Sequence, residues 1–326
     1  MSQAENTPSL KRSALSAGSE PEAPVLIHSG CKVNLYLEIT GLLPNGYHGI
    51  RTLMLSLRSP FDRMRVSCVE GSDLTVLAAD FIDPRNNTLK KSYDLYAQKL
   101  QGMRVKAGQA GLPGLRVELE KGVPHGAGLG GGSADAAALL LFLERCRQER
   151  GFTPLGRAAL LEIAAAVGAD VPFFIIGETA WAEGIGEKLT PAPTPFEGMH
   201  LVLVCPPIPV STPWAYAAWD EMQTSSTRAL TSSAAQDTYL LSAQFGLGDL
   251  FNSFEEVVFP KHPELASIKR KLLDLGAGGA LMSGSGSSVF GIFSDVEKAE
   301  EASAAMQKSG LKAFGQAINA GASPSW

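Results

Sequence analysis

A glycine-rich stretch at residues 124–133 limits what this chain can fold into more than any other feature. Five glycines fall between Gly126 and Gly132. The preceding residues 115–120 alternate apolar and charged side chains, which predicts a strand with one solvated face. Ser133 is then predicted to be an N-cap, and the Ala/Leu run after it predicts a buried helix. A strand, a glycine loop and a helix start bind phosphate well, because backbone N–H groups can approach the anion closely.

Other interpretations of this stretch fit the residues less well. The string from Gly126 to Gly131 matches G-x-G-x-x-G, but a dinucleotide fold needs a buried parallel strand before it and an acid at a later strand end. Here the preceding strand suits an antiparallel sheet, and Glu144 and Glu149 fall within the predicted helix. A Walker loop would need Gly-Lys-Ser/Thr, which is missing. A turn without a ligand remains the simplest alternative, although ordering five glycines is entropically costly.

Composition narrows the class of protein. A length of 326 residues favours two domains, and the net charge of −5 argues against a nucleic-acid surface. No apolar run reaches the roughly 18 residues that a membrane span needs. The four cysteines are far apart and the five histidines show no ligand spacing, which favours free thiols in a reducing cytoplasm and no structural metal. Residues 1–23 predict a disordered tail without a targeting signal.

A second set of polar residues lies in the first predicted hairpin. Residues 25–40 alternate as a strand, which places Lys32 and Asn34 side by side on its polar face. A solvated polar face is the ordinary explanation for a strand lysine. The turn at residues 43–46 puts Tyr47 and His48 near the hairpin tip.

A third candidate, Asp170, follows a helix predicted from Thr153 to Val167 and ended by Gly168. The apolar residues 171–174 are predicted to be a strand. A carboxylate in this place is at least partly buried and needs a cationic partner, for which Lys32 is the candidate. The alternative is an aspartate that only caps its local turn.

These pieces, far apart in sequence, suit phosphoryl transfer. The glycine loop would hold the donor phosphates, Asp170 would accept the proton of the acceptor hydroxyl, and Lys32 would keep Asp170 ionised. Asn34 would orient either the acceptor or Asp170. A second glycine-rich loop at residues 283–288 would pack against the first or contact phosphate directly. A composition change at residues 190–197 marks a domain boundary, and residues 221–247 form a polar, Ser/Thr-rich excursion.

Three motifs occur in the order typical of the GHMP kinase superfamily, which the chain resembles over residues 30–318. They are Lys32-Val33-Asn34-Leu35, the loop at residues 124–133, and residues 279–286. A narrower combination resembles the 4-diphosphocytidyl-2-C-methyl-D-erythritol kinase family. It comprises the Lys32 motif and residues 44–48, 168–172 and 182–187.

The resemblance implies a two-domain α+β fold with the active site in the cleft between the domains. After the tail at 1–23, residues 24–195 would form a ribosomal-protein-S5-like domain that binds ATP, and residues 196–326 a ferredoxin-like domain. The implied activity is ATP-dependent phosphorylation of the 2-hydroxyl of 4-diphosphocytidyl-2-C-methyl-D-erythritol, with Mg²⁺. The protein would be a cytoplasmic monomer or homodimer that binds small molecules rather than nucleic acid or membrane.

The resemblance also implies residue roles. Asp170 would be the general base and Lys32 its partner. Tyr47 and Tyr216 would sandwich the cytosine, with His48 hydrogen-bonded to the base and Asn34 also contacting substrate. The residues implied for ATP are Pro124, Gly126, Gly128, Leu129, Gly130, Gly131, Gly132 and Ser133. The supporting loop is Ser283, Gly284, Ser285 and Gly286.

The chain departs from the family pattern at two positions. Gly49 stands where an acid is usual, and Ala134 where a second serine is common, which removes a hydroxyl near the phosphates. The competing functions are another GHMP kinase acting on mevalonate, homoserine or a sugar, and a non-catalytic nucleotide-binding protein. The presence of both Lys32 and Asp170 argues against the non-catalytic alternative.

Overall fold

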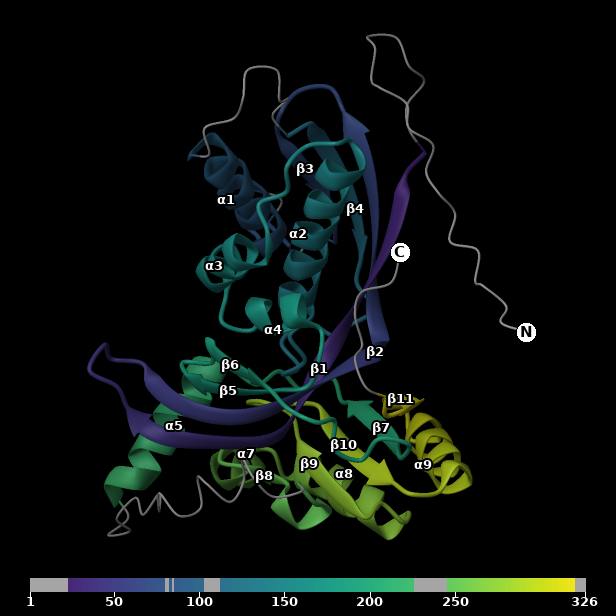
Figure 1. Cartoon of the computed structure of the whole chain (residues 1–326). Coiled ribbons are helices and arrows are strands. Elements are labelled where there is room, and N and C mark those ends of the chain that lie inside the picture. The colour runs from purple at the N-terminus through teal and green to yellow at the C-terminus, as the bar shows by residue number, and fades with distance from the viewer. Residues whose placement is uncertain (1–22, 80–81, 84, 103–111, 226–244, 320–326) are drawn as a thin grey trace.

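The fold contains two β-sheets with helices packed on them (Figure 1). The computed structural model describes residues 23–79, 82–83, 85–102, 112–225 and 245–319. The predicted tail at 1–23, apart from its last residue, and most of the predicted excursion at 221–247 lie outside these ranges. Residues 221–225 belong instead to a helix. None of the helices in the described ranges is long and apolar enough to cross a membrane.

The hairpin of β1 (Val25–Leu42) and β2 (His48–Val69) is the longest strand pair. The strands run antiparallel through both the upper and the lower part of the view in Figure 1. The predicted alternation is confirmed, but the polar face is not simply solvated. Lys32 and Asn34 are both buried, at 5% and 2% exposure.

The first sheet has seven strands. Its main order is β3-β4-β2-β1-β8, and β5 pairs with β2 and with β6. The remaining strands of this sheet are β3 (Leu74–Leu77), β4 (Gly114–Glu120), β5 (Ala180–Gly184), β6 (Lys188–Pro191) and β8 (Phe251–Asn252). All its pairs are antiparallel except β3 with β4 and β1 with β8. The antiparallel arrangement expected for β4 is therefore confirmed for its pairing with β2.

Four helices pack over the upper part of this sheet. They are α1 (Thr88–Gly102), α2 (Gly131–Glu149), α3 (Arg157–Val167) and α4 (Val171–Ile176). The Leu and Tyr side chains of α1 recur at helical spacing and are buried. The Asn87 carboxamide oxygen accepts a hydrogen bond from the Lys90 N–H and so caps the helix.

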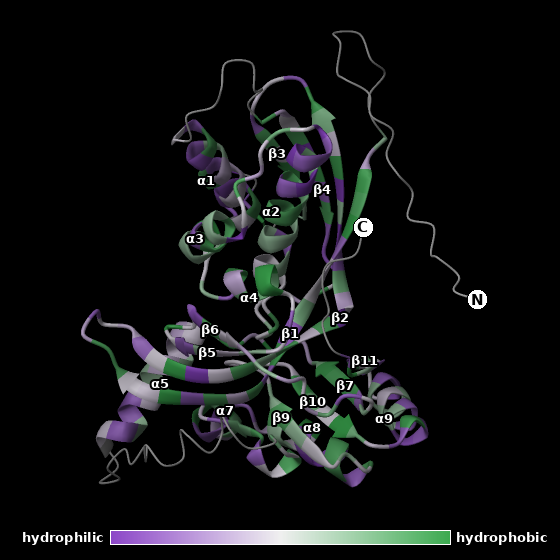
Figure 2. Ribbon diagram, in the orientation of Figure 1, coloured by the Kyte–Doolittle hydropathy of each residue, from purple (hydrophilic) through white to green (hydrophobic). Residues whose placement is uncertain are grey.

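The second sheet has four antiparallel strands in the order β11-β7-β10-β9. They are β7 (His200–Cys205), β9 (Gly279–Met282), β10 (Val289–Phe293) and β11 (Lys312–Ala317). One face packs on the apolar side of β1 and β2, and the other on helices, so β7, β9 and β10 are hydrophobic on both faces (Figure 2). The helices of this half are α5 (Thr212–Ser225), α7 (Glu255–Lys261), α8 (Pro263–Asp274) and α9 (Val296–Lys308), with the 3₁₀ turn η1 (Leu247–Asp249).

Three local predictions were wrong. Residues 171–176 form α4 rather than a strand, because a short apolar run has no diagnostic period and Pro172 suits a first helical turn. Helix α3 starts at Arg157 rather than at Thr153. Helix α2 starts at Gly131 with Gly130 as its N-cap, so Ser133 lies within the first turn.

Candidate active site

The glycine loop has the backbone that its sequence demands. Gly126, Gly128 and Gly130 have φ angles of 66°, 76° and 69°, a region that side chains disfavour. The last of them turns the chain into α2, where the N–H groups of Ser133 and Ala134 both point back to the Gly130 carbonyl. The loop therefore ends at a helix N-terminus that presents N–H donors and a partial positive charge.

The second glycine-rich loop braces the first. The Ser283 hydroxyl donates to the Gly128 carbonyl at 3.1 Å and accepts from the Asn34 N–H at 3.2 Å. The Lys32 N–H donates to the Leu129 carbonyl at 2.9 Å. Backbone of β1, the first loop and residue 283 thus meet in one hydrogen-bonded unit.

Lys32 and Asp170 lie together, as their chemistry predicts. The Lys32 ammonium is 3.6 Å from the Asp170 carboxylate and donates to the Asn34 side-chain oxygen at 2.7 Å. Asn34 in turn donates to the Thr52 hydroxyl at 2.8 Å, so its orientation is fixed. Asp170 stands at the N-cap position of α4, but its side chain makes no capping hydrogen bond there, which disfavours a purely local role. Its carboxylate is about one-third exposed, at 34%.

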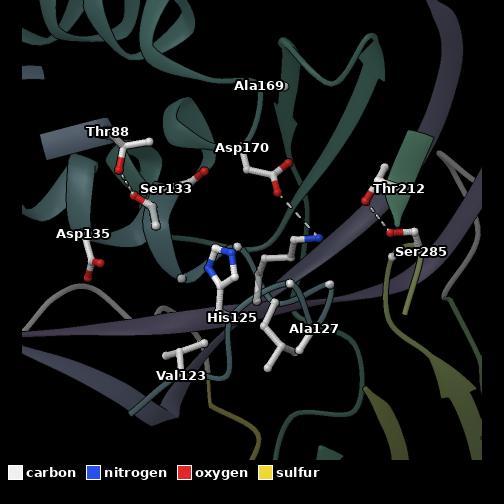
Figure 3. A pocket seen from close by; sticks show the side chains of 18 of the residues that line it. Thr88, Val123, His125, Ala127, Ser133, Asp135, Ala169, Asp170, Thr212 and Ser285 are labelled. Carbon is white, nitrogen blue, oxygen red and sulfur yellow. Dashed lines mark hydrogen bonds and ion pairs between the residues drawn. The ribbon is translucent and has the colours of Figure 1, made fainter. Parts of the chain in front are cut away.

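These groups line one cavity of about 660 Å³. Figure 3 shows the Asp170 carboxylate pointing into it, with Thr88 and Ser133 on one side and Thr212 and Ser285 on the other. Most of the predicted site residues line this cavity: Lys32, Asn34, Pro124, Gly126, Gly128, Leu129, Gly130, Gly131, Gly132, Ser133, Asp170, Tyr216, Gly284 and Ser285. The lining does not include Tyr47, His48, Ser283 or Gly286.

The residues predicted to contact a base gather where the hairpin tip meets α5. The His48 ring stacks on the Tyr216 ring with centroids 4.5 Å apart and planes 19° apart. Tyr216 lines the cavity, and burial followed by the charge of Asp170 raises the pKa of its phenol. Tyr47, the predicted partner of Tyr216 in the sandwich, is 64% exposed. In this structure the ring that stacks on Tyr216 is that of His48.

The sequence predictions missed a buried ion cluster beside the glycine loop. The Lys121 ammonium bridges Asp62 and Asp135, at 2.9 Å for the latter, and the Ser29 hydroxyl donates to Asp135. Burial, opposed by Lys121, raises the pKa of Asp135 to about 7. Burial also lowers the pKa of Lys121, but the two carboxylates raise it more, to a net increase. The sequence feature that could have revealed this cluster is Asp135, a charged residue within the Ala/Leu run of the predicted helix.

Asp62 connects this cluster to the start of the loop. It accepts hydrogen bonds from the N–H groups of Gly122 and Val123, both at 2.8 Å. Because Lys121 also lines the cavity, the cluster both anchors the loop and supplies part of the wall. The predictions also missed Thr212 of α5, whose hydroxyl lies 2.7 Å from that of Ser285, a residue of the predicted supporting loop.

Comparison with known proteins decides the family. The GHMP kinases N terminal domain model matches residues 87–178, and the GHMP kinases C terminal model matches residues 232–312. The 4-diphosphocytidyl-2-C-methyl-D-erythritol kinase of Nitratidesulfovibrio vulgaris strain Hildenborough is 46% identical over 294 residues, which cover 89% of this chain and 97% of that protein. The chain belongs to the 4-diphosphocytidyl-2-C-methyl-D-erythritol kinase family.

Other relatives agree with this assignment to the GHMP kinases. The kinase of the same name from Syntrophotalea carbinolica is 37% identical, covering 87% of this chain and 95% of that protein. A crystal structure of 4-(cytidine 5'-diphospho)-2C-methyl-D-erythritol kinase superposes with a TM-score of 0.68 at 32% identity, covering 91% of this chain and all of that one. The homoserine kinase of Cytophaga hutchinsonii, 18% identical with a TM-score of 0.64 and coverage of 96% and 99%, shares the fold.

Family membership confirms the predicted two-domain α+β GHMP kinase fold and makes ATP the co-substrate. The part of the cavity at the glycine loop suits a phosphate group, because the helix N-terminus attracts anions. Asp170 and Tyr216 of α5 line the same cavity.

Proposed function

We propose that this 4-diphosphocytidyl-2-C-methyl-D-erythritol kinase family member transfers the γ-phosphoryl group of ATP to the 2-hydroxyl of 4-diphosphocytidyl-2-C-methyl-D-erythritol, a step of the non-mevalonate isoprenoid pathway. The observation that carries the proposal is the Lys32–Asp170 pair in a cavity that also contains the glycine loop. The names of the relatives supply the acceptor.

In the proposed reaction, Asp170 accepts the proton of the acceptor hydroxyl as the new phosphorus–oxygen bond forms. The bond between the γ-phosphorus and the bridging oxygen breaks, and ADP leaves. Lys32 orients the Asp170 carboxylate, and its hydrogen bond to Asn34 fixes the ammonium in place. A positioned base of this kind contributes about 10²–10⁴ in rate. Residues 126–133 hold the β- and γ-phosphates through backbone N–H groups.

Mg²⁺ would enter with ATP rather than occupy a preformed protein site. Among the described residues no group of three acidic, histidine or cysteine side chains suits a metal ion. The Asp135 carboxylate, the buried acid nearest in sequence to the loop, is already bonded to Ser29 and Lys121. The residues present therefore fit an ion held by phosphate oxygens and water, with the Ser133 hydroxyl as its protein ligand. When bound, Mg²⁺ neutralises developing charge on the phosphates.

The cytidyl group of the acceptor would bind between α5 and the hairpin tip. Tyr216 supplies an aromatic face at the cavity wall, and Tyr47 and His48 lie on the facing hairpin. Stacking of a base on such a side chain contributes roughly 1–3 kcal/mol. Since His48 now covers one face of Tyr216, a sandwich between Tyr47 and Tyr216 requires that ring to move or the base to use another face.

We also retain the division into domains at residues 24–195 and 196–326, a monomer or homodimer, and the cytoplasm as the location. The division into domains is supported by the path of the chain, which passes from the seven-stranded to the four-stranded sheet between β6 and β7, although β8 returns to the seven-stranded sheet. The cytoplasmic location is supported by the four cysteines, which are all free thiols.

The test is coupled release of ADP from the purified protein with MgATP and 4-diphosphocytidyl-2-C-methyl-D-erythritol, beside mevalonate, homoserine and galactose. Turnover with the cytidyl substrate alone supports the proposal, and turnover only with a control substrate refutes it. Asp170→Asn should lower kcat by about 10²–10⁴ while ATP still binds. Asp274→Asn, an exposed change at the end of α8, is the matched control.

A further inference from the structure

The Asp220 side chain on α5 contacts the edge of the His48 ring, whose face stacks on Tyr216. Its carboxylate oxygen is 2.8 Å from Nε2 of His48. The same ring lies flat on Tyr216 and meets Trp219 edge-on, with centroids 6.1 Å apart and planes at 90°. The His48 side chain is 14% exposed and the Asp220 side chain 49% exposed. Three residues of one helix thus contact the His48 ring.

The contact also fixes where the neutral imidazole carries its proton. An ionised carboxylate only accepts hydrogen bonds, so Nε2 of His48 must be the donor. In the neutral ring the other nitrogen, Nδ1, then has a lone pair and accepts. A donor in place of Asp220 would reverse both roles. The Asp220 carboxylate therefore determines that Nδ1, the ring nitrogen that it does not contact, is a hydrogen-bond acceptor.

The His48 ring lies in the part of the molecule that the proposed function gives to the base, although His48 does not itself line the cavity. The proposed function puts the acceptor hydroxyl at Asp170, and Tyr216 links the cavity to the hairpin tip, because it lines the cavity and stacks on His48. A nucleotide that extends away from Asp170 along α5 meets the Tyr216–His48 pair. No other histidine lies on α5 or the hairpin tip within the described chain.

We propose that Asp220 is a positioning residue that makes the enzyme select cytosine over uracil by holding His48 with Nδ1 as an acceptor. Cytosine presents its N4 amino group as a donor, whereas uracil presents the O4 acceptor at the same place. Nδ1 can accept a hydrogen bond from the N4 amino group of cytosine. Opposite uracil, Nδ1 and O4 are both acceptors, so both stay unpaired. Sites that leave a buried polar group unpaired reject the analogue strongly. This inference deepens the proposed function and depends on it.

The first experiment observes the tautomer directly. Protein with ¹⁵N-labelled histidine is examined by two-bond ¹H–¹⁵N NMR at about pH 8, where histidine side chains are normally neutral. His48→Gln identifies the signal among the five histidines. We expect the Nε2–H tautomer in the wild type and in Asp220→Glu, and a mixture of tautomers in Asp220→Ala. The Nδ1–H tautomer in the wild type would overturn the proposal.

The second experiment measures base selection. The ratio of kcat/KM for the cytidyl substrate to that for its uridyl counterpart is determined for the wild type, Asp220→Ala, Asp220→Glu and Asp274→Ala. In Asp220→Ala the ratio should fall roughly tenfold, equivalent to about 1.4 kcal/mol, while the KM for ATP stays constant. Asp220→Glu and Asp274→Ala should keep the wild-type ratio.

The outcomes separate the two proposals. A ratio unchanged in Asp220→Ala overturns base selection by this residue, although the kinase function stands. Equal losses for both substrates and for ATP would mean that Asp220 only stabilises α5, which also overturns the proposal. If the wild type phosphorylates neither substrate, the proposed function is wrong and base selection is wrong with it, whatever tautomer the NMR spectrum shows.

Discussion

Replacement of Gly128 by alanine tests how closely the two glycine-rich loops depend on each other. A Cβ at this position would lie 2.2 Å from the backbone carbonyl oxygen of Ser283, and φ is +76°. Gly126 has nearly the same backbone, with φ at +66°, but a Cβ there would meet nothing within 4 Å. The pair therefore separates the cost of the backbone conformation from the cost of the loop contact.

The expected magnitudes differ for the two variants. An alanine in the left-handed region costs about 1–2 kcal/mol at either position. The clash at Gly128 forces the loops apart and adds about 1–3 kcal/mol, typical of overpacking against a group that cannot rotate away. Gly126→Ala should thus lower the free energy of unfolding by about 1–2 kcal/mol and Gly128→Ala by about 2–5 kcal/mol.

The assay is urea unfolding of both variants, followed by the KM for ATP. Gly128→Ala should raise that KM more than Gly126→Ala, because it displaces the loop whose carbonyl bonds to Ser283. Gly→Ala effects on the unfolded chain are common to both variants and cancel in the comparison. Equal losses of stability, together with equal KM values, would refute the reasoning that the second loop braces the first.

Three further changes test the buried polar groups. Burial raises the pKa of Asp135 to about 7, so below this pH the folded protein keeps a proton that the unfolded chain has already lost. The free energy of unfolding should therefore fall as pH rises through about 7, by about 1.4 kcal/mol between about pH 6 and pH 8. Urea unfolding of Asp135→Asn should show no such fall. Asn252→Ala leaves two backbone carbonyls unpaired and should lower the free energy of unfolding by about 2–4 kcal/mol. Ser253→Ala loses one hydrogen bond and should lower it by about 1 kcal/mol. Similar midpoints of the two variants in thermal unfolding would contradict this. Burial raises the pKa of the Cys31 thiol well above its usual value, and it raises the pKa of Cys205 to about 11. Mass spectrometry should therefore find both thiols unalkylated by iodoacetamide until the protein unfolds, and early modification of either would count against their burial.

Sequence reasoning located the parts of the site whose residue types have few alternative explanations. The glycine loop needs positive φ angles, which other residues disfavour, so its composition alone predicts a tight turn at a helix start. The Tyr and Leu stripe of α1 has a clear helical period. Asp170 was identified because a charge between apolar segments needs a partner, and Lys32 lies beside it in the structure.

The sequence predictions failed where long-range contacts decide the structure. Five of the six apolar residues of α4 are buried, and a short apolar run can be buried in a helix or in a strand, so the pattern does not distinguish the two. Lys121 lies beside Asp62 only because β2 and β4 pair, and no local pattern records that pairing. Asp220 is one of two adjacent acids on α5, and only the long-range contact with the hairpin tip brings His48 against it.

The short strand β8 has a consequence for synthesis of the protein. It is the parallel partner of β1, and its Asn252 side chain donates to the carbonyls of Met282 and Gly284 in the second loop. A ribosome releases β1 long before β8, so the growing chain exposes an unpaired strand edge at Tyr36 and Leu37 until three-quarters of the sequence has emerged. The nascent chain therefore passes through a stage at which this short edge is open to pairing with another chain.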